Sequence, residues 1–230
     1  MSARYAKSTG ITVVGGGALD AATLARALAV APTLVAADGG ADRALALGHC
    51  PARVIGDLDS LSAAARARLG ADRVEHDGDQ ETTDFDKVLS VIEAPFVVAV
   101  GFAGARLDHT LAAMSTLARN TNRRVILDTG ADLCLLCPPR LALDLPTGAR
   151  VSLYPLAPLR CRSEGLVWPT DQLTFSPLGR IGTSNAATGG KVVLEPDAPA
   201  LLALFEIRAL TPLLAALRAA PPWPPDARAR

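Results

Sequence analysis

Short apolar runs alternate with amphipathic segments along the first 130 residues of the chain. Helical patterns, with apolar side chains three and four residues apart, separate these runs and are expected over 19–29, 62–69, 85–92 and 106–120. This alternation predicts an α/β domain whose mostly parallel sheet carries helices on both faces. The runs that predict its strands cover residues 11–14, 33–37, 53–56, 73–76, 96–100 and 124–128.

The pattern changes after about residue 130, where helical periodicity fades and turns rich in Pro and Gly separate short strand-like runs. This spacing predicts a C-terminal antiparallel β-sandwich. We therefore expect domains at 1–130 and 131–207, followed by a Pro- and Arg-rich tail at 208–230 that is peripheral or disordered. Strands of the second domain are expected at 132–137, 141–145, 150–154, 160–166, 179–183, 191–195 and about 200–206.

Composition narrows the class of protein. Hydrophobic residues make up 50% of the 230-residue chain, yet no apolar run approaches the roughly 20 residues that cross a bilayer. The first seven residues lack the apolar core of a signal peptide. No basic stripe with interleaved aromatic residues is present. We therefore expect a soluble, cytoplasmic protein with neither membrane nor nucleic-acid partners.

Charge is unevenly distributed between the two halves of the chain. Residues 1–110 hold 10 Lys and Arg against 14 Asp and Glu, a net charge of −4, whereas residues 111–230 hold 13 against 9, a net charge of +4. An acidic half suits the binding of metal ions, because Mg²⁺ prefers oxygen ligands.

The most informative stretch is 54–60, in which Asp57 and Asp59 follow the end of a buried strand. In an extended backbone, residues two apart point to the same side, so we expect these carboxylates to aim at one point. Two adjacent like charges need a positive partner, and Mg²⁺ held by carboxylates and substrate phosphates is one such partner. The alternative is a solvated turn before the helix that starts near Ser62.

Three further acidic residues stand at corresponding places. Asp38 follows a strand, Asp84 lies in the first turn of a helix, and Asp108 lies at a helix start just beyond another strand. Ligands of parallel sheets bind outside the carboxyl ends of the strands. Five acids crowd the stretch 77–86, which favours an acidic loop over a metal–phosphate site rather than a helix cap alone.

Two other features leave alternatives open. The loop Gly15–Gly17 between a strand and a helix either presents N–H groups to a phosphate or makes a tight turn. Its spacing is not a dinucleotide fingerprint, because Asp20 stands where a third glycine would be needed. In the helix that follows 96–100, one apolar face is expected, made by Leu107, Leu111, Met114 and Leu117 or Ala118.

An ordered set of short motifs lies between about residues 11 and 206. The motifs are Ala37-Asp38-Gly39-Gly40-Ala41, Gly56-Asp57-Leu58-Asp59-Ser60, Asp79-Gln80-Glu81-Thr82-Thr83-Asp84-Phe85, Arg106-Leu107-Asp108-His109, Gly165-Leu166-Val167-Trp168 and Gly182-Thr183-Ser184-Asn185. In these motifs the chain resembles the thiamine pyrophosphokinase family. Each motif is weak alone, whereas the ordered set is specific.

The resemblance implies an enzyme that transfers pyrophosphate from Mg·ATP to the hydroxyethyl oxygen of thiamine and releases AMP. It also implies a homodimer whose active sites combine the first domain of one subunit with the second domain of the other. By position, the metal and catalytic carboxylates would be Asp57, Asp59, Asp84 and Asp108. ATP contacts are implied for Asp38, Gly39, Gly40, Ser60, Gln80, Thr83, Arg106 and His109, and thiamine contacts for Trp168, Ser184 and Asn185.

The chain departs from the family pattern at Ala105, which replaces the second glycine of a Gly-Gly pair. Alanine would be strained there if the position required a positive φ. Two other functions fit the same motifs: transfer to another small heterocyclic alcohol, or a non-catalytic sensor that binds thiamine or nucleotide. Many like charges in one place favour catalysis over binding alone.

Overall fold

The parallel sheet of the first unit brings the carboxyl ends of its strands to one level. In the computed structural model, which describes residues 5–104 and 106–224, the chain divides into Met1–Thr116 with Leu127–Gly130, and Leu117–Ile126 with Ala131–Arg230. Ala105, and with it the question of backbone strain there, lies outside the described residues.

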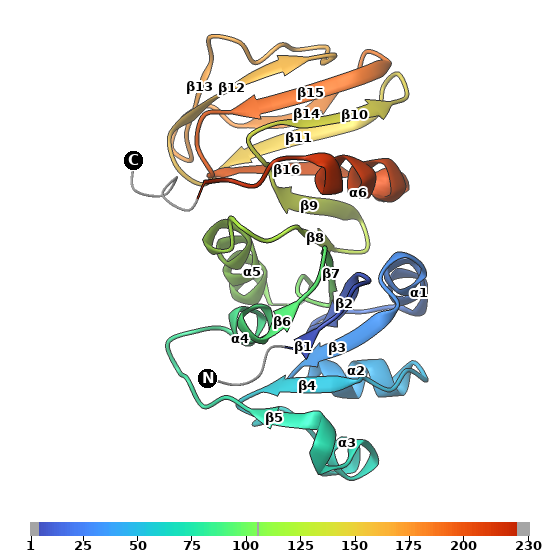
Figure 1. Ribbon diagram of the computed structural model, residues 1–230. Helices are drawn as coiled ribbons and strands as arrows, with labels where there is room; N and C mark the ends of the chain where they lie inside the picture. Colours follow the sequence, from blue (N-terminus) through green and yellow to red (C-terminus); the bar gives the residue numbers. More distant parts are fainter. Residues whose placement is uncertain (1–4, 105, 225–230) are drawn as a thin grey trace. The chain divides into compact units, whose positions relative to one another are not determined.

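Five parallel strands form the centre of the first unit, in the order β7, β2, β3, β4, β5 (Figure 1). Val14 pairs in register with Ala36 and Val100, and Gly56 pairs with His76. The segments that follow these strands therefore begin at one edge. The strands are β1 (Tyr5–Ala6), β2 (Ile11–Val14), β3 (Thr33–Ala37), β4 (Arg53–Gly56), β5 (Val74–His76), β6 (Ile92–Glu93), β7 (Val97–Val100) and β8 (Val125–Asp128).

Helices cover both faces of this sheet, as the alternating pattern predicts. Helices α1 (Ala21–Val30), α2 (Gly40–Ala46) and α3 (Ala63–Leu69) lie on one face, and α4 (Asp84–Val91) lies on the other (Figure 1). Their starts follow from local chemistry. Side-chain oxygens of Asp20, Ser62 and Thr83 accept the N–H groups of Thr23, Ala65 and Asp86 at the first turns of α1, α3 and α4.

Close backbone packing explains the glycines at the edge of the sheet. A Cβ on Gly15 or Gly17 would stand 2.6 Å from the Gly101 carbonyl oxygen, and one on Gly40 would stand 2.1 Å from that of Val14. The N–H groups of Gly15 and Gly17 donate to the carbonyls of Val100 and Gly101. These two amides are therefore used inside the fold, which favours the tight-turn interpretation of this loop.

Helix α5 (Leu107–Arg119) differs from the prediction at its start. Leu107 is 70% exposed and Leu111 is 58% exposed, while Ala113, Thr116 and Leu117 are buried. The helix therefore packs through a face rotated away from Leu107 and Leu111, because packing against neighbours, and not the longest apolar row, selects the buried side. Leu107 and Leu111 of this helix therefore remain on the surface.

Two groups of antiparallel strands make up the second unit. Neighbouring strands follow the order β14, β11, β16, β9 in one group and β10, β15, β12, β13 in the other, so this part of the chain is antiparallel as expected. The strand expected at 179–183 forms later, at Gly182–Ala186. The strands are β9 (Asp132–Leu136), β10 (Leu141–Leu145), β11 (Arg150–Pro155), β12 (Leu159–Glu164), β13 (Thr174–Phe175), β14 (Gly182–Ala186), β15 (Gly190–Pro196) and β16 (Leu201–Glu206).

The prediction of a peripheral tail from residue 208 is wrong for the residues that the structure describes. Helix α6 (Leu210–Ala219) buries Leu213, Leu214 and Leu217 within the second unit. Beyond it, the Trp223 indole N–H donates to the Cys137 carbonyl at 2.9 Å and the ring is buried. The alternation of Leu and Ala is an amphipathic helix that completes this core, and the Pro-rich segment behind it holds the tryptophan in place.

Trp223→Ala is expected to destabilise the second unit by about 3–5 kcal/mol, because it removes a buried ring. Trp223→Phe keeps one aromatic ring but loses the hydrogen bond and part of the buried volume, so its expected cost is smaller, about 1–3 kcal/mol. Urea unfolding followed by circular dichroism measures both. An alanine variant as stable as the wild type would contradict this role of the segment.

Candidate active site

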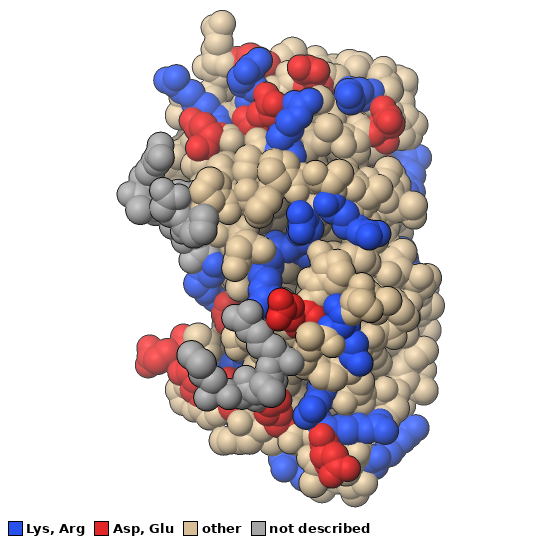
Figure 2. Space-filling model, viewed as in Figure 1, with Lys and Arg blue, Asp and Glu red and all other residues tan. Residues whose placement is uncertain are grey.

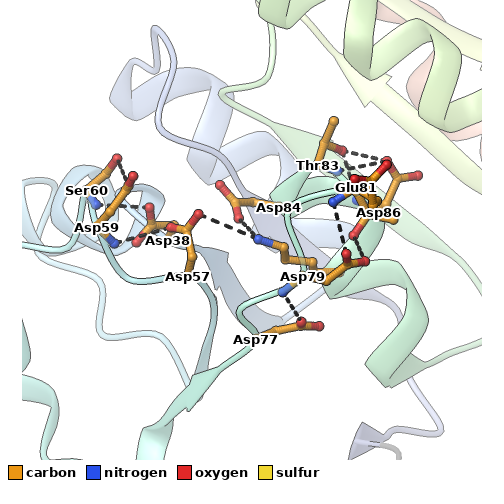
Figure 3. A network of polar contacts seen from close by, with 12 residues as sticks. Asp38, Asp57, Asp59, Ser60, Asp77, Asp79, Glu81, Thr83, Asp84 and Asp86 are labelled. Atoms are coloured by element: carbon orange, nitrogen blue, oxygen red, sulfur yellow. Dashed lines mark hydrogen bonds and ion pairs between the residues drawn. The ribbon is translucent and has the colours of Figure 1, made fainter.

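Three carboxylates converge at the carboxyl edge of the sheet in the first unit. Asp38 follows β3, and Asp57 and Asp59 follow β4; each offers one oxygen, and the three oxygens lie within 4.8 Å of one another (Figure 3). Oxygen ligands of this kind suit Mg²⁺. The family resemblance implies ATP contacts for Asp38, whereas the structure groups it with the candidate metal ligands Asp57 and Asp59.

The pair Asp57 and Asp59 converges through a turn, not through an extended strand. Leu58 between them has a φ of 65°, and the Asp59 N–H donates to Asp57 Oδ1 at 3.3 Å. A leucine with positive φ is strained. Its side chain packs against the apolar cluster that includes Leu45, Leu61 and Leu69, and this packing holds the backbone in the turn that presents both acids.

Asp38 is the most buried of the three. Its φ of 41° is unusual for a residue other than glycine, its exposure is 3%, and Oδ2 accepts the Ser60 N–H at 3.1 Å. The other oxygen, Oδ1, is buried without a hydrogen-bond partner among the described residues. Buried polar atoms are normally paired, so this oxygen points to a ligand that completes the site.

Burial raises the pKa of the Asp38 carboxyl, and the charge of Asp84 raises it further, against the N–H donated by Ser60. The pKa of Asp57 is lowered instead. Its causes are first the Asp59 N–H and then, against some burial, the charge of Lys87 and a hydrogen bond from the Gln80 side chain. The two carboxylates thus differ in how readily each ionises.

Lys87 is the buried cation beside this group, and the pattern of acids in the sequence did not point to it. Its Nζ lies 3.2 Å from Asp84 Oδ1 and 3.7 Å from Asp57 Oδ2, and its side chain is 3% exposed. Burial lowers the pKa of Lys87, but the hydrogen bond to Asp84 and the nearby acids outweigh this effect, so the pKa is raised. The spacing Asp84-x-x-Lys87 at a helix start was the available signal.

Glycine at position 56 makes room for these acids. A Cβ there would stand 2.8 Å from the Cβ of Asp38 and 3.2 Å from Asp84 Oδ1. Gly39 similarly approaches Ser60, where an added Cβ would stand 3.1 Å from the serine Cβ. Ser60 in turn donates its hydroxyl to Asp59 Oδ1 at 2.8 Å. Gly39, Gly40 and Ser60 therefore shape and orient the site through packing and hydrogen bonds.

Most acids of the stretch 77–86 serve the loop itself. Asp77 accepts the Asp79 N–H, Asp79 accepts the Glu81 N–H and the Thr82 hydroxyl, and Asp86 accepts the Thr83 hydroxyl (Figure 3). These contacts are turns and a capping box, so only Asp84 of the five reaches toward Asp57 through Lys87. Figure 2 shows the acidic side chains gathered at the lower left of the view, over the connection between β5 and α4.

Asp108 lies outside the converging group. Arg106 donates to both of its oxygens, at 3.2 and 2.5 Å, and both side chains are largely exposed. Hydrogen bonding to Arg106 lowers the pKa of Asp108. His109 is exposed beside them. The Phe102 ring in the preceding loop stacks on Phe85 of α4 with centroids 4.1 Å apart, which ties this loop to the start of α4.

The residues assigned to thiamine lie together in the second unit. Asn185 Oδ1 accepts the Trp168 N–H at 3.2 Å, and Asn185 Nδ2 donates to the Trp168 carbonyl at 2.7 Å. Ser184, with a φ of 60°, donates its N–H to Ser152 Oγ. Asn185 therefore holds the backbone of Trp168, and the Trp168 ring itself is 61% exposed. An exposed aromatic ring on a fixed backbone can stack against a flat cationic ring.

The geometry agrees with comparisons to known proteins. Residues 24–127 match the family model described as "Thiamin pyrophosphokinase, catalytic domain". Thiamine pyrophosphokinase 1 of Oryza sativa subsp. japonica is 26% identical in an alignment 197 residues long that covers 71% of this chain and 75% of that protein. Thiamine pyrophosphokinase 1 of Arabidopsis thaliana is 27% identical over 199 residues, covering 72% and 74%.

Solved structures share the fold. Yeast thiamin pyrophosphokinase superposes with a TM-score of 0.72 at 16% identity, covering 94% of each chain. Thiamin pyrophosphokinase from Geobacillus thermodenitrificans superposes with a TM-score of 0.70 at 21% identity, covering 86% of this chain and 97% of that one.

Among the described residues, no helix is both long and apolar enough to cross a membrane.

Asp38→Asn is expected to raise the melting temperature of the metal-free protein by a few degrees at neutral pH. Because the folded pKa is raised, ionising Asp38 costs stability above the unfolded pKa of about 3.9, and asparagine avoids that cost. The difference should shrink as the pH falls toward the unfolded value. Thermal melts across this range measure it.

The same thermal melts with Mg²⁺ added test whether Asp38 binds the metal. Mg²⁺ should raise the melting temperature of the wild type more than that of Asp38→Asn, because a ligand that binds only the folded state stabilises it. A variant less stable than the wild type at neutral pH without metal would contradict the account of Asp38.

Proposed function

We propose that the chain, whose residues 24–127 match the catalytic-domain model of the thiamine pyrophosphokinase family, makes thiamine diphosphate by transferring pyrophosphate from Mg·ATP to thiamine. The observation that carries the proposal is the convergence of Asp38, Asp57 and Asp59 at the edge of the sheet. Transfer of a phosphoryl-type group depends on positioning and on neutralising charge, and little covalent chemistry falls to the protein.

The donor set fits a divalent metal. Three carboxylate oxygens lie within 4.8 Å of one another, and the buried Oδ1 of Asp38 lacks a partner among the described residues. Asp38, Asp57 and Asp59 would hold Mg²⁺. When bound, Mg²⁺ would neutralise the phosphate oxygens and make the β-phosphorus more open to attack.

The remaining chemistry falls to the chain's own groups. In the proposed reaction the thiamine hydroxyl oxygen bonds to the β-phosphorus, and the bond from that phosphorus to the oxygen bridging to the α-phosphate breaks, so AMP leaves. A carboxylate takes the hydroxyl proton. A metal-held carboxylate is a weak base, which leaves this role to Asp84 or Asp108, both outside the converging group.

Basic and polar side chains near the acids suit the triphosphate. The Arg106 guanidinium is exposed and already pairs with a carboxylate, a geometry that phosphate oxygens can share. Gln80 reaches Asp57 by a hydrogen bond and could turn to a phosphate. Thr83 caps α4, and His109 is exposed beside Asp108, so we assign both to the rim of the nucleotide site.

Asp57→Asn and Asp59→Asn are each expected to lose several orders of magnitude in turnover with the fold intact, because each removes an anionic ligand. The measurement is thiamine-dependent release of AMP from Mg·ATP. Asp72→Asn, at an exposed acid away from the converging group, is the matched control and should keep wild-type rates.

The wild-type product identifies the reaction. AMP release that depends on thiamine supports the proposal. Release of ADP would mean that a single phosphoryl group is transferred. Release of AMP only with another heterocyclic alcohol would mean that thiamine is not the acceptor. Binding of thiamine without AMP release would identify a sensor, and near-normal rates in both asparagine variants would remove the metal-site assignment.

We also propose a cytoplasmic homodimer in which each active site combines the acids of one subunit with Trp168, Ser184 and Asn185 of the other. The apolar Leu107 and Leu111 beside Asp108 are exposed in the single chain, and exposed large apolar side chains near a site are typical of protein interfaces. If the site is shared in this way, two inactive variants can restore activity in a mixed dimer, which is not expected if each site lies within one chain.

Asp57→Asn and Trp168→Ala are each expected to have low activity at limiting thiamine, the first through the metal site and the second through a raised KM. Co-expressed as a mixed dimer, the two chains should recover part of the wild-type rate, because one of the two shared sites then carries neither change. Trp168→Phe keeps a ring and should stay close to the wild-type KM. A mixed dimer with no recovery would mean that each site lies within one chain.

A further inference from the structure

Lys87 brings a positive charge into the interior of the carboxylate site. Lysine is rarely buried unless it is paired, and here the side chain is 3% exposed. Its two partners come from different elements: Asp84 lies one turn earlier on α4, and Asp57 follows β4. The ammonium group therefore bridges two carboxylates that would otherwise face each other without compensation.

Asp57 belongs to two sets of groups at once. One of its oxygens joins Asp38 and Asp59 in the converging group, and its Oδ2 faces the Lys87 ammonium at 3.7 Å. Asp84 Oδ1 lies 3.2 Å from the same ammonium (Figure 3). One buried cation thus contacts both a member of the group of three and Asp84, which lies next to that group.

Carboxylates that bracket a point in a phosphoryl-transfer site can hold a second divalent ion there, as two-metal sites do. We propose that the Lys87 ammonium occupies this second position, so that the protein's own carboxylates hold a single divalent ion and Asp84 is withheld from metal binding. This inference rests on the proposed function of the site. It makes Lys87 a positioning residue that sets how many ions the acids bind.

The direction of the effect follows from charge. Replacing lysine by the neutral methionine removes a positive charge from among four acids and leaves Asp57 and Asp84 with an unoccupied space between them. Removing one partner of a buried pair destabilises the protein because the other charge is left alone. A divalent ion that binds in that space would again neutralise Asp57 and Asp84. In the wild type the Lys87 ammonium already does this.

The test counts Mn²⁺ bound to nucleotide-free protein by electron paramagnetic resonance. Wild type and Lys87→Arg, which both keep the charge, should bind one tight ion per chain. Lys87→Met should bind a second. Adding Asp84→Asn to Lys87→Met removes the surplus negative charge, and this double variant should return to one ion.

Thermal melts without metal give an independent measurement. Lys87→Met should melt several degrees below the wild type at the same pH, Mn²⁺ should reverse most of that loss, and the double variant should need no metal to recover. A Lys87→Met chain that folds only with Mn²⁺ present supports the inference as well. A chain that binds one ion with unchanged affinity, or stays unfolded at saturating Mn²⁺, overturns it.

The ion count is separate from the reaction. If wild type releases no AMP but the Mn²⁺ counts follow the expected series, the proposed function fails and the role of Lys87 stands. If AMP release is normal and Lys87→Met still binds one ion, the role of Lys87 fails while the function stands.

Discussion

Mutual repulsion among carboxylates is the constraint around which the first unit is built. Asp38, Asp57, Asp59 and Asp84 come to one edge of a sheet, where every ionised pair raises the energy of the folded state. Two features compensate for this repulsion: the N–H groups donated by Asp59 and Ser60, and the buried ammonium of Lys87. The compensation is incomplete, because Asp38 Oδ1 is buried without a partner among the described residues, and a site that binds a cation requires such an incomplete balance.

The backbone around the acids bears strain for the same purpose. Asp38 and Leu58 both have positive φ values, and neither is glycine. Such conformations persist only where surrounding packing holds them. Here Leu58 is held by the apolar cluster of β3, β4, α2 and α3, so part of the core's packing energy is used to aim carboxylates. Stability and ligand binding are therefore coupled in this region, and gains in one would come at the expense of the other.

The second unit follows a different physical logic. Its aromatic candidate, Trp168, is exposed, and its position is set by two hydrogen bonds between its backbone and the Asn185 amide. The ring is free to meet a ligand while its attachment is rigid, an arrangement that lowers the entropy lost on binding.

Some of this was determined by the sequence alone. Continuous apolar runs and amphipathic helical patterns specify the strands and helices locally, because each depends on residues within one turn or one strand, and the caps at Asp20, Ser62 and Thr83 fix where α1, α3 and α4 begin. The ordered motifs also placed Asp57 and Asp59 in the site. Only the tertiary structure decided how the other acids lie, because the register of β3 and β4 brings Asp38 beside Asp57, Lys87 links Asp84 to Asp57, and Asp108 turns instead to Arg106. The buried state of Lys87, the exposed Leu107 and Leu111, and the packed C-terminal helix were likewise decided there, since burial depends on neighbours distant in the chain that no local pattern records.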